Sequence, residues 1–186
     1  MTSEESPSRK VRLAAVFYLL TFVTGGAALF VRGRAGFAAG LVAGACYIAV
    51  TILFYYIFKP AGRSLSLLAA FISLAGCAMG PLGALHLVPA SVNSLVFFGF
   101  YCLLIGALIF RSTFLPRFLG GLMVFAGLGW LTFLSPPFAS RLSPYVFFPG
   151  ILGEGALTLW LLVKGVDVQR WKEQAYDPGV KQRRRA

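Results

Sequence analysis

The stretch VNSLVFFGFYCLLIGALIF, residues 92–110, decides the fold class of this chain. Its nineteen residues hold no Asp, Glu, Lys, Arg or His, and about 20 mostly apolar residues are enough for a helix to cross a bilayer. Five further runs are similarly apolar: residues 13–31, 36–58, 65–88, 118–134 and 145–166. Continuous runs exclude a β-barrel, whose strands alternate, so the sequence predicts an all-α polytopic membrane protein with six transmembrane helices.

The composition supports the same class. Hydrophobic residues make up 58% of the chain and charged residues 12%, about half the charged share of a soluble domain. The connecting segments are too short to hold a soluble domain. The sequence therefore predicts three regions: an N-terminal cytoplasmic tail (1–10), a six-helix transmembrane domain (11–168) and a basic cytoplasmic C-terminal tail (169–186).

The net charge of +11 would also suit a nucleic-acid-binding protein, but its distribution indicates membrane orientation instead. Positive charge collects in cytoplasmic segments of membrane proteins. With both termini in the cytoplasm, fourteen of the seventeen Lys and Arg residues fall on that side and only three fall outside, namely Arg32, Arg34 and Arg141. We expect no nucleic-acid partner, and attraction to anionic membrane lipids is a secondary role of this charge.

Glu154 is the only acidic residue inside a predicted span. Ionised groups are costly at the bilayer centre, so an intramembrane carboxyl group is a hypothesis for a functional site by default. It lies about nine residues, or roughly 13 Å, inside the predicted outer boundary. Gly150 and Thr158 share its helix face, and Gly153 and Gly155 flank it. We expect Glu154 to point into the bundle, with Thr158 beside it.

Tyr101 is the best candidate partner for Glu154, because no Lys or Arg is predicted at that depth. It lies about equally deep in residues 92–110, and Ser94 shares its helix face one heptad earlier. The sequence predicts a contact between Glu154 and Tyr101, direct or through water, with Ser94 in the same ligand-binding group.

Two proline sites are predicted at one depth in the outer half of the membrane. Pro81 comes late in a run that leads outward, and Pro149 comes early in a run that leads inward. A proline inside a helix removes a hydrogen bond and bends it. Two such breaks favour an outward-opening cavity, and simple packing kinks are the alternative. His86, the only histidine, falls at the rim, either as a headgroup contact or as a proton-accessible group of the cavity.

The second run carries Gly36, Gly40 and Gly44 at intervals of four. Small residues at this spacing let helix backbones approach closely, which predicts a face buried against a neighbouring helix. That neighbour could belong to the same chain or to a homo- or hetero-oligomer formed through the second helix.

The remaining polar residues of the spans indicate packing rather than catalysis. Tyr18, Thr21 and Thr24 are interpreted as helix-to-helix hydrogen-bonding residues, and Cys46, Cys77 and Cys102 as small packing residues. The cysteine spacing does not suit a metal, and no nucleophile, carboxylate pair or phosphate loop is evident. We expect no cofactor, no metal and no catalytic residue, and an intramembrane acid–base pair of Glu154 and Tyr101 is the enzymatic alternative.

Several stretches resemble bacterial membrane proteins grouped as domain of unknown function 4386. They are RLAAVFYLLTFVTGG (12–26), KPAGRSLSLLAAF (59–71), FFGFYCLLIGALIFRSTFLPRFLGGLM (97–123) and GEGALTLWLLVKGVDVQRW (153–171). The resemblance implies a multi-pass protein of the bacterial cytoplasmic membrane with no assigned activity. Members commonly have a longer segment where this chain has RGRAGF after the first span, and many carry histidine in place of Tyr101, whereas Glu154 fits the family pattern.

The sequence thus favours a non-enzymatic binder of a small lipophilic molecule or a lipid. Glu154 and Tyr101 would be the polar anchor of an outward-facing pocket with apolar walls. A secondary transporter or proton-coupled permease that titrates Glu154 is the first alternative. An accessory subunit that binds its complex through the Gly36–Gly44 face is the second.

Overall fold

The computed structural model describes residues 7–31, 33–89 and 92–176, so the outer parts of both predicted tails, 1–6 and 177–186, lie outside it. Its helices are α1 (Pro7–Phe30), α2 (Gly33–Phe58), α3 (Arg63–Ala84), α4 (Ser94–Arg111), α5 (Arg117–Leu131), η1 (Thr132–Leu134), α6 (Pro136–Leu142), η2 (Tyr145–Phe147), α7 (Phe148–Val163) and α8 (Val168–Tyr176). Six of the described helices are long and apolar enough to cross a membrane. The prediction of an all-α, multi-pass membrane protein is confirmed.

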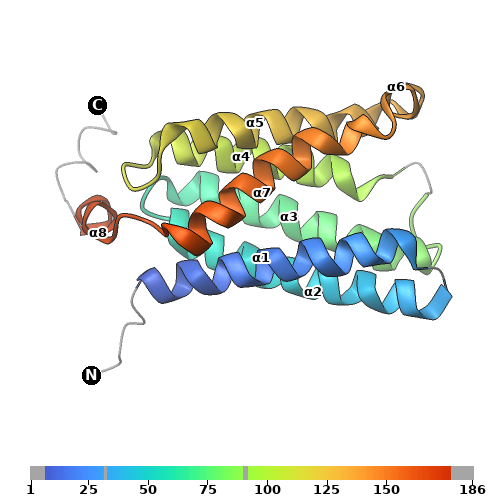
Figure 1. The fold of residues 1–186 in the computed structure, drawn as a ribbon, viewed down its shortest axis with the longest axis horizontal. Helices are drawn as coiled ribbons and strands as arrows, with labels where there is room; N and C mark the ends of the chain where they lie inside the picture. The colour runs from blue at the N-terminus through green and yellow to red at the C-terminus, as the bar shows by residue number, and fades with distance from the viewer. Residues whose placement is uncertain (1–6, 32, 90–91, 177–186) are drawn as a thin grey trace.

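The six long helices run roughly along one direction (Figure 1), and their contacts close a ring in chain order. Each of α1 to α4 contacts the next helix, α5 contacts α7, and α7 returns to contact α1. Short connections make successive helices antiparallel, so α1 begins and α7 ends at the same end of the bundle, where α8 also lies. The short helix α6 lies at the opposite end, between α5 and α7.

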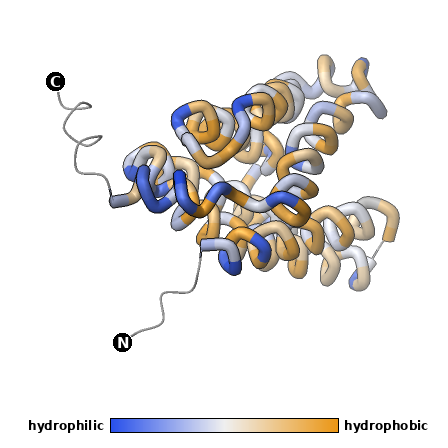
Figure 2. Tube along the Cα trace, turned by 60° about the vertical axis from the view of Figure 1, so that its left-hand side comes forward, coloured by the Kyte–Doolittle hydropathy of each residue, from blue (hydrophilic) through white to orange (hydrophobic). Residues whose placement is uncertain are grey.

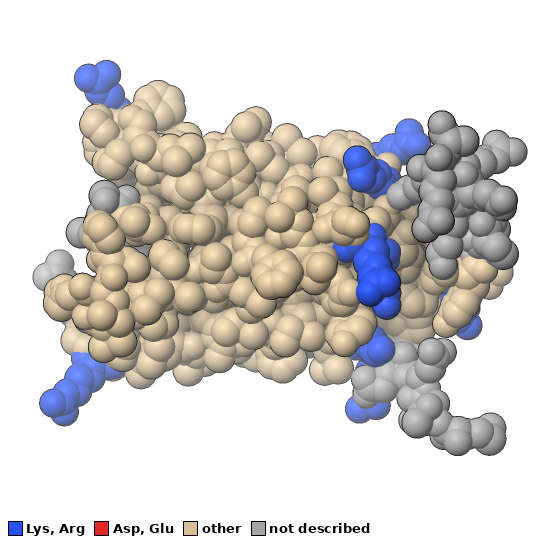
Figure 3. Space-filling model, turned by 180° about the vertical axis from the view of Figure 1, so that it is seen from behind, with Lys and Arg blue, Asp and Glu red and all other residues tan. Residues whose placement is uncertain are grey.

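Charge separates the two ends of the ring. Figure 2 shows hydrophobic residues along the lengths of the helices, and Figure 3 shows Lys and Arg gathered at the ends, more of them at one end than at the other. The richer end, called the basic end here, carries Arg9, Lys10, Arg12, Lys59, Arg63, Arg111, Arg117, Lys164, Arg170 and Lys172. The other, called the far end, carries Arg34 and Arg141 among the described residues.

The third span is shorter than its apolar run, because α3 ends at Ala84 and not at residue 88. Two residues later His86 adopts a left-handed backbone conformation with φ 56°. The amide of Leu87 donates to the carbonyl of Leu82 at 2.9 Å, which is the helix-ending Schellman pattern. His86 is therefore an exposed helix-terminating residue at the far end.

Neither proline breaks a helix in the way the sequence analysis predicts. Pro149 is the second residue of α7, where a helix needs no amide donor, because the residues before it form the separate turn η2. The prediction of a helix break at Pro149 is wrong for this reason. Pro81 does lie inside α3, but the helix continues past it to Ala84.

Large apolar side chains pack the half of the ring next to the basic end. Phe54, Phe58, Ile105, Leu108 and Leu161 are all buried there, close to the ends of α2, α4 and α7. This half is therefore a closed core. The half next to the far end has a different interior, which contains the candidate site.

Candidate ligand site around Glu154

Glu154 is buried at the centre of the ring, six residues after the start of α7, and is only 5% exposed. The hydroxyl of Tyr18 on α1 donates to Oε2 at 2.5 Å, and the indole Nε1 of Trp130 on α5 donates to Oε1 at 2.5 Å. The thiol of Cys102 on α4 lies 3.6 Å from the same Oε1. Side chains from three other helices thus converge on one carboxyl group.

Two glycines of α7 create the space for this arrangement. A β-carbon at Gly150 would overlap the indole ring of Trp130, so only glycine lets that ring lie against α7 and reach Glu154. A β-carbon at Gly153 would collide with the backbone carbonyl of Leu122, so this glycine lets α7 pack closely on α5. Gly155, in contrast, has no atom near its missing β-carbon within 4 Å.

Tyr47 on α2 extends the polar group beyond Glu154. Its hydroxyl lies 3.4 Å from the hydroxyl of Tyr18, and either atom could be the donor. Its ring contacts Phe98 and Tyr101, with centroid separations of 4.7 and 5.8 Å. A hydroxyl group on α2 is thereby linked through α1 to the carboxyl group on α7.

The direct hydrogen bond predicted between Glu154 and Tyr101 is not made. The hydroxyl of Tyr101 is buried and has no hydrogen-bond partner among the described residues. Tyr101 has the right depth but not the right rotation about α4, whereas its neighbour Cys102 faces the carboxyl group. Tyr18 takes the role that the sequence analysis gives to Tyr101.

A cavity of about 620 Å³ lies beside Glu154 and is partly open. Its walls come mainly from the far-end halves of the helices and are formed by some of the residues within 18–26 of α1, 40–48 of α2, 76–81 of α3, 94–98 of α4 and 151–154 of α7, together with Trp130 and Phe147. Most of these residues are apolar or glycine. Glu154, Tyr18 and Tyr47 lie near the middles of their helices, at the inner end of the cavity, and Thr21, Cys77 and Ser94 add polar side chains nearer the far end.

The predicted site residues divide into those that line the cavity and those that do not. Ser94 and Pro81 are in the wall with Glu154. Thr158 is buried, but its hydroxyl donates to the backbone carbonyl of Glu154 at 2.8 Å within the same helix. His86, Tyr101 and Pro149 are absent from the described wall.

Within one chain, the three glycines of α2 do not share a buried packing face, and a contact with a second chain through them stays a prediction. Gly40 and Gly44 line the cavity, and no atom lies within 4 Å of a β-carbon built at Gly44. Only Gly36 is tightly packed, against the backbone carbonyl of Val31 in the turn from α1. A β-carbon at Gly40 would lie 4.0 Å from the β-carbon of Ala28 on α1, an ordinary contact that does not require glycine.

Trp130, Tyr47 and Cys102 are site residues that the sequence analysis misses, and Tyr18 is recognised only as a hydrogen-bonding residue. The sequence does contain a pattern that predicts Trp130 as a partner of Glu154. A buried indole N–H in an apolar run requires an acceptor, and Glu154 is the strongest acceptor in the spans. Thr21 and Thr24 do not bond between helices. Their hydroxyls donate to backbone carbonyls four residues earlier in α1.

The geometry supports hydrogen bonding and charge recognition. The walls formed by the described residues contain no Lys, Arg or His, and the searched residues contain no group of three or more metal-ligating side chains. Each carboxyl oxygen of Glu154 has two lone pairs. Oε1 accepts from Trp130 and Cys102, whereas Oε2 accepts from Tyr18 and can also accept from a ligand.

Comparison with known proteins identifies the family. The family described as "Domain of unknown function (DUF4386)" matches residues 32–93 and 91–165, and the chain belongs to it. An uncharacterized protein of Archaeoglobus fulgidus is 26% identical over 129 residues, which cover 63% of this chain and 76% of that protein. No solved structure matches the chain.

Proposed function

We propose that this DUF4386 member is a non-enzymatic membrane protein that binds a small lipophilic molecule or a lipid in the cavity beside Glu154. The observation that carries the proposal is the mostly apolar 620 Å³ cavity with a buried carboxyl group at its inner end. Ligand sites commonly have this volume and combine apolar walls with a few polar groups that fix orientation. Glu154 would hold the polar end of the ligand, and the walls from α1 to α4 would hold the apolar body.

The charge distribution supports an orientation for this binder. Ten described Lys and Arg residues lie at the basic end and two at the far end, and the positive-inside tendency supports an orientation with the basic end in the cytoplasm. The cavity would then open away from the cytoplasm. In a bacterial cell the protein would sit in the cytoplasmic membrane and receive its ligand from the outer leaflet or the space beyond it.

Transport is the alternative that the packing favours less. Between Glu154 and the basic end the ring is filled by fully buried side chains such as Ile105, Leu108 and Leu161. A solute that left the cavity toward the basic end would have to displace this core. Binding at a site open on one side needs no such rearrangement.

Native mass spectrometry of the detergent-purified protein tests the proposal. We expect wild type to retain a small molecule or lipid that the Glu154→Gln variant loses, because the amide keeps the size of the side chain but not its charge or its acceptor pair. Ser73→Ala is the matched control, since Ser73 is buried and hydrogen-bonded but lies outside the cavity wall.

Two results would contradict the proposal. Equal retention by wild type and Glu154→Gln, with both folded, would make Glu154 a structural hydrogen-bonding residue. Solute or proton movement in proteoliposomes that Glu154→Gln abolishes would identify a transporter instead.

A further inference from the structure

We infer that the ligand of this cavity is a lipophilic organic cation, such as a protonated or quaternary amine, whose positive group lies against Glu154. The inference rests on the proposed binding function and adds the charge and chemical class of the ligand. Three independent features of the described residues support it: the charge balance of the cavity, the geometry at the carboxyl group and the aromatic lining.

The cavity has an acidic group and no opposing basic one. Glu154 is the only acidic residue in the described spanning helices, and the wall contains no Lys, Arg or His. A buried carboxylate without a counter-charge is unfavourable in a membrane protein. A cationic ligand supplies the missing charge, whereas a fatty acid or a phosphate would place a second negative group beside the first.

The neighbours of Glu154 hold it ready to accept a donor or a positive charge. Tyr18 donates to one carboxyl oxygen and Trp130 to the other, so both oxygens are fixed in position by hydrogen bonds. The two donors come from α1 and α5, the helices on either side of α7. Oε1 also accepts from the thiol of Cys102, so Oε2 is the oxygen that keeps a lone pair for a ligand. Hydrogen bonds to a charged group are about twice as strong as neutral ones.

Aromatic rings surround the approach to Glu154. Six described aromatic residues line the cavity and form two groups of ring contacts: Tyr18, Phe22, Tyr47 and Phe98 in one, and Trp130 and Phe147 in the other. The faces of aromatic rings attract cations, and clusters of such rings recognise quaternary ammonium groups. The same rings are apolar, so they also suit the hydrocarbon part of a lipophilic cation.

A pair of ions with the same shape and opposite charge tests the inference. Binding of tetraphenylphosphonium and tetraphenylborate would be measured by equilibrium dialysis against the full-length protein in phosphatidylcholine nanodiscs, with empty nanodiscs subtracted. We expect saturable binding of the cation only. In Glu154→Gln the affinity should fall at least about tenfold, which corresponds to about 1.4 kcal/mol.

Aromatic variants keep the test decisive if Glu154→Gln folds poorly. Phe98→Leu should weaken cation binding about threefold, because it removes a ring face and retains an apolar side chain. Phe71→Leu, on the exposed outer face of α3, should leave the affinity unchanged. A cation affinity that is equal in wild type, a folded Glu154→Gln and Phe98→Leu would overturn the inference.

The outcomes also separate this inference from the proposed function. Saturable binding of tetraphenylborate, or no saturable binding of tetraphenylphosphonium, would overturn the cation assignment. If native mass spectrometry then still showed a neutral molecule that Glu154→Gln loses, the binding function would stand without the charge. If neither experiment showed a ligand, both would fail.

Discussion

The glycines between α4 and α5 differ from most of the glycines around the cavity in what surrounds them. Between α4 and α5, Gly99 faces Gly127 and Gly106 faces Gly120, so that the two backbones touch. A β-carbon at Gly106 would lie 2.9 Å from the carbonyl oxygen of Gly120, and one at Gly127 would lie 2.8 Å from that of Gly99. On the other side, Gly26, Gly44 and Gly80 line the cavity, and a β-carbon at any of them would meet nothing within 4 Å.

This difference shows how a membrane protein can be rigid and hollow at once. Lipid chains are as apolar as leucine, so spanning helices associate through close packing and hydrogen bonds rather than through the hydrophobic effect. The α4–α5 side obtains its cohesion from backbone contact. The α1–α2–α3 side leaves backbone uncovered around the cavity, and Glu154 joins the sides because it accepts from Trp130 on one and Tyr18 on the other.

The largest expected loss of stability comes from a branched side chain between α4 and α5, called the closed side here. Gly106→Val would push into the side chain of Val124 and the backbone of Gly120, and overpacking of this kind should reduce the free energy of unfolding by about 3 kcal/mol. The midpoint of unfolding in mixed detergent micelles measures it. Gly44→Val is the matched control and should cost far less, because its surroundings are empty. Equal destabilisation by both would mean that the sides do not differ as described.

A second prediction concerns the contact between Trp130 and α7. Gly150→Ala would displace the indole ring and break its hydrogen bond to Glu154, at a cost of about 2 kcal/mol in unfolding free energy. The emission spectrum of Trp130 should change as well, measured in a background where Trp160 and Trp171 are phenylalanine.

Gly155→Ala is the control for that experiment, since it adds the same methyl group to the same helix in open space. An unchanged spectrum and stability in Gly150→Ala would show that the indole does not lie against α7. Trp130 would then not connect the α4–α5 side of the ring to Glu154.

The third prediction concerns the α1–α2–α3 side, called the open side here, and tests whether a hydrogen bond between helices stabilises it. Thr51 on α2 and Ser73 on α3 have their hydroxyls 2.6 Å apart. Thr51→Val should lower the unfolding free energy by about 0.6 kcal/mol, the average for such bonds between membrane helices. Thr158→Val is the control, because the hydroxyl of Thr158 bonds only to its own helix. A larger loss in the control would contradict a role for the Thr51–Ser73 bond.

Hydropathy was sufficient to predict the spans, because lipid requires long apolar helices whatever their neighbours are. It also identified Glu154, since a carboxyl group in such a helix is costly and needs a reason. The partner of Glu154 could not be predicted in the same way. Depth along a helix follows from counting residues, but the choice between Tyr101 and Cys102 depends on helix rotation, which only packing against neighbouring helices determines.

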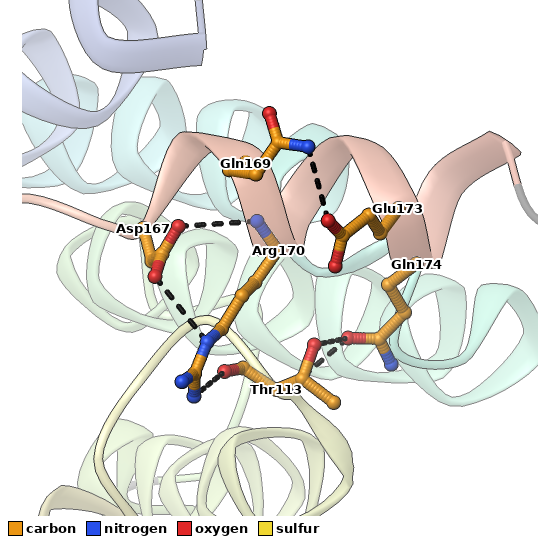
Figure 4. Close-up of polar contacts among 6 residues, drawn as sticks. All are labelled: Thr113, Asp167, Gln169, Arg170, Glu173 and Gln174. Carbon is orange, nitrogen blue, oxygen red and sulfur yellow. Dashed lines mark hydrogen bonds and ion pairs between the residues drawn. The ribbon is translucent and has the colours of Figure 1, made fainter.

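The C-terminal helix shows a similar limit. The sequence analysis predicts a basic tail over residues 169–186, but not the contacts that the first part of it makes. In the structure Trp171 donates to the carbonyl of Ile57, while Arg170 and Gln174 contact Thr113 in the α4–α5 loop (Figure 4). These hydrogen bonds join segments far apart in sequence, so no local pattern contains them.

The variant with the smallest expected change in stability gives the sharpest test of the difference between the two sides of the ring. Gly44→Leu places a large side chain where no atom lies within 4 Å of the new β-carbon, so the unfolding free energy should stay within about 0.5 kcal/mol of wild type. The same side chain would occupy part of the cavity, so the ligand detected by native mass spectrometry should be lost. Gly121→Leu, also in open space but outside the cavity wall, should change neither property.

Loss of ligand without loss of stability would separate the two uses of glycine, since the open glycines would then serve binding and the closed ones folding. If Gly44→Leu instead destabilised the protein as much as Gly106→Val, the space beside Gly44 would be a packed helix contact. The stripe of Gly36, Gly40 and Gly44 would then be the interface that its spacing predicts, and the cavity would lose one wall.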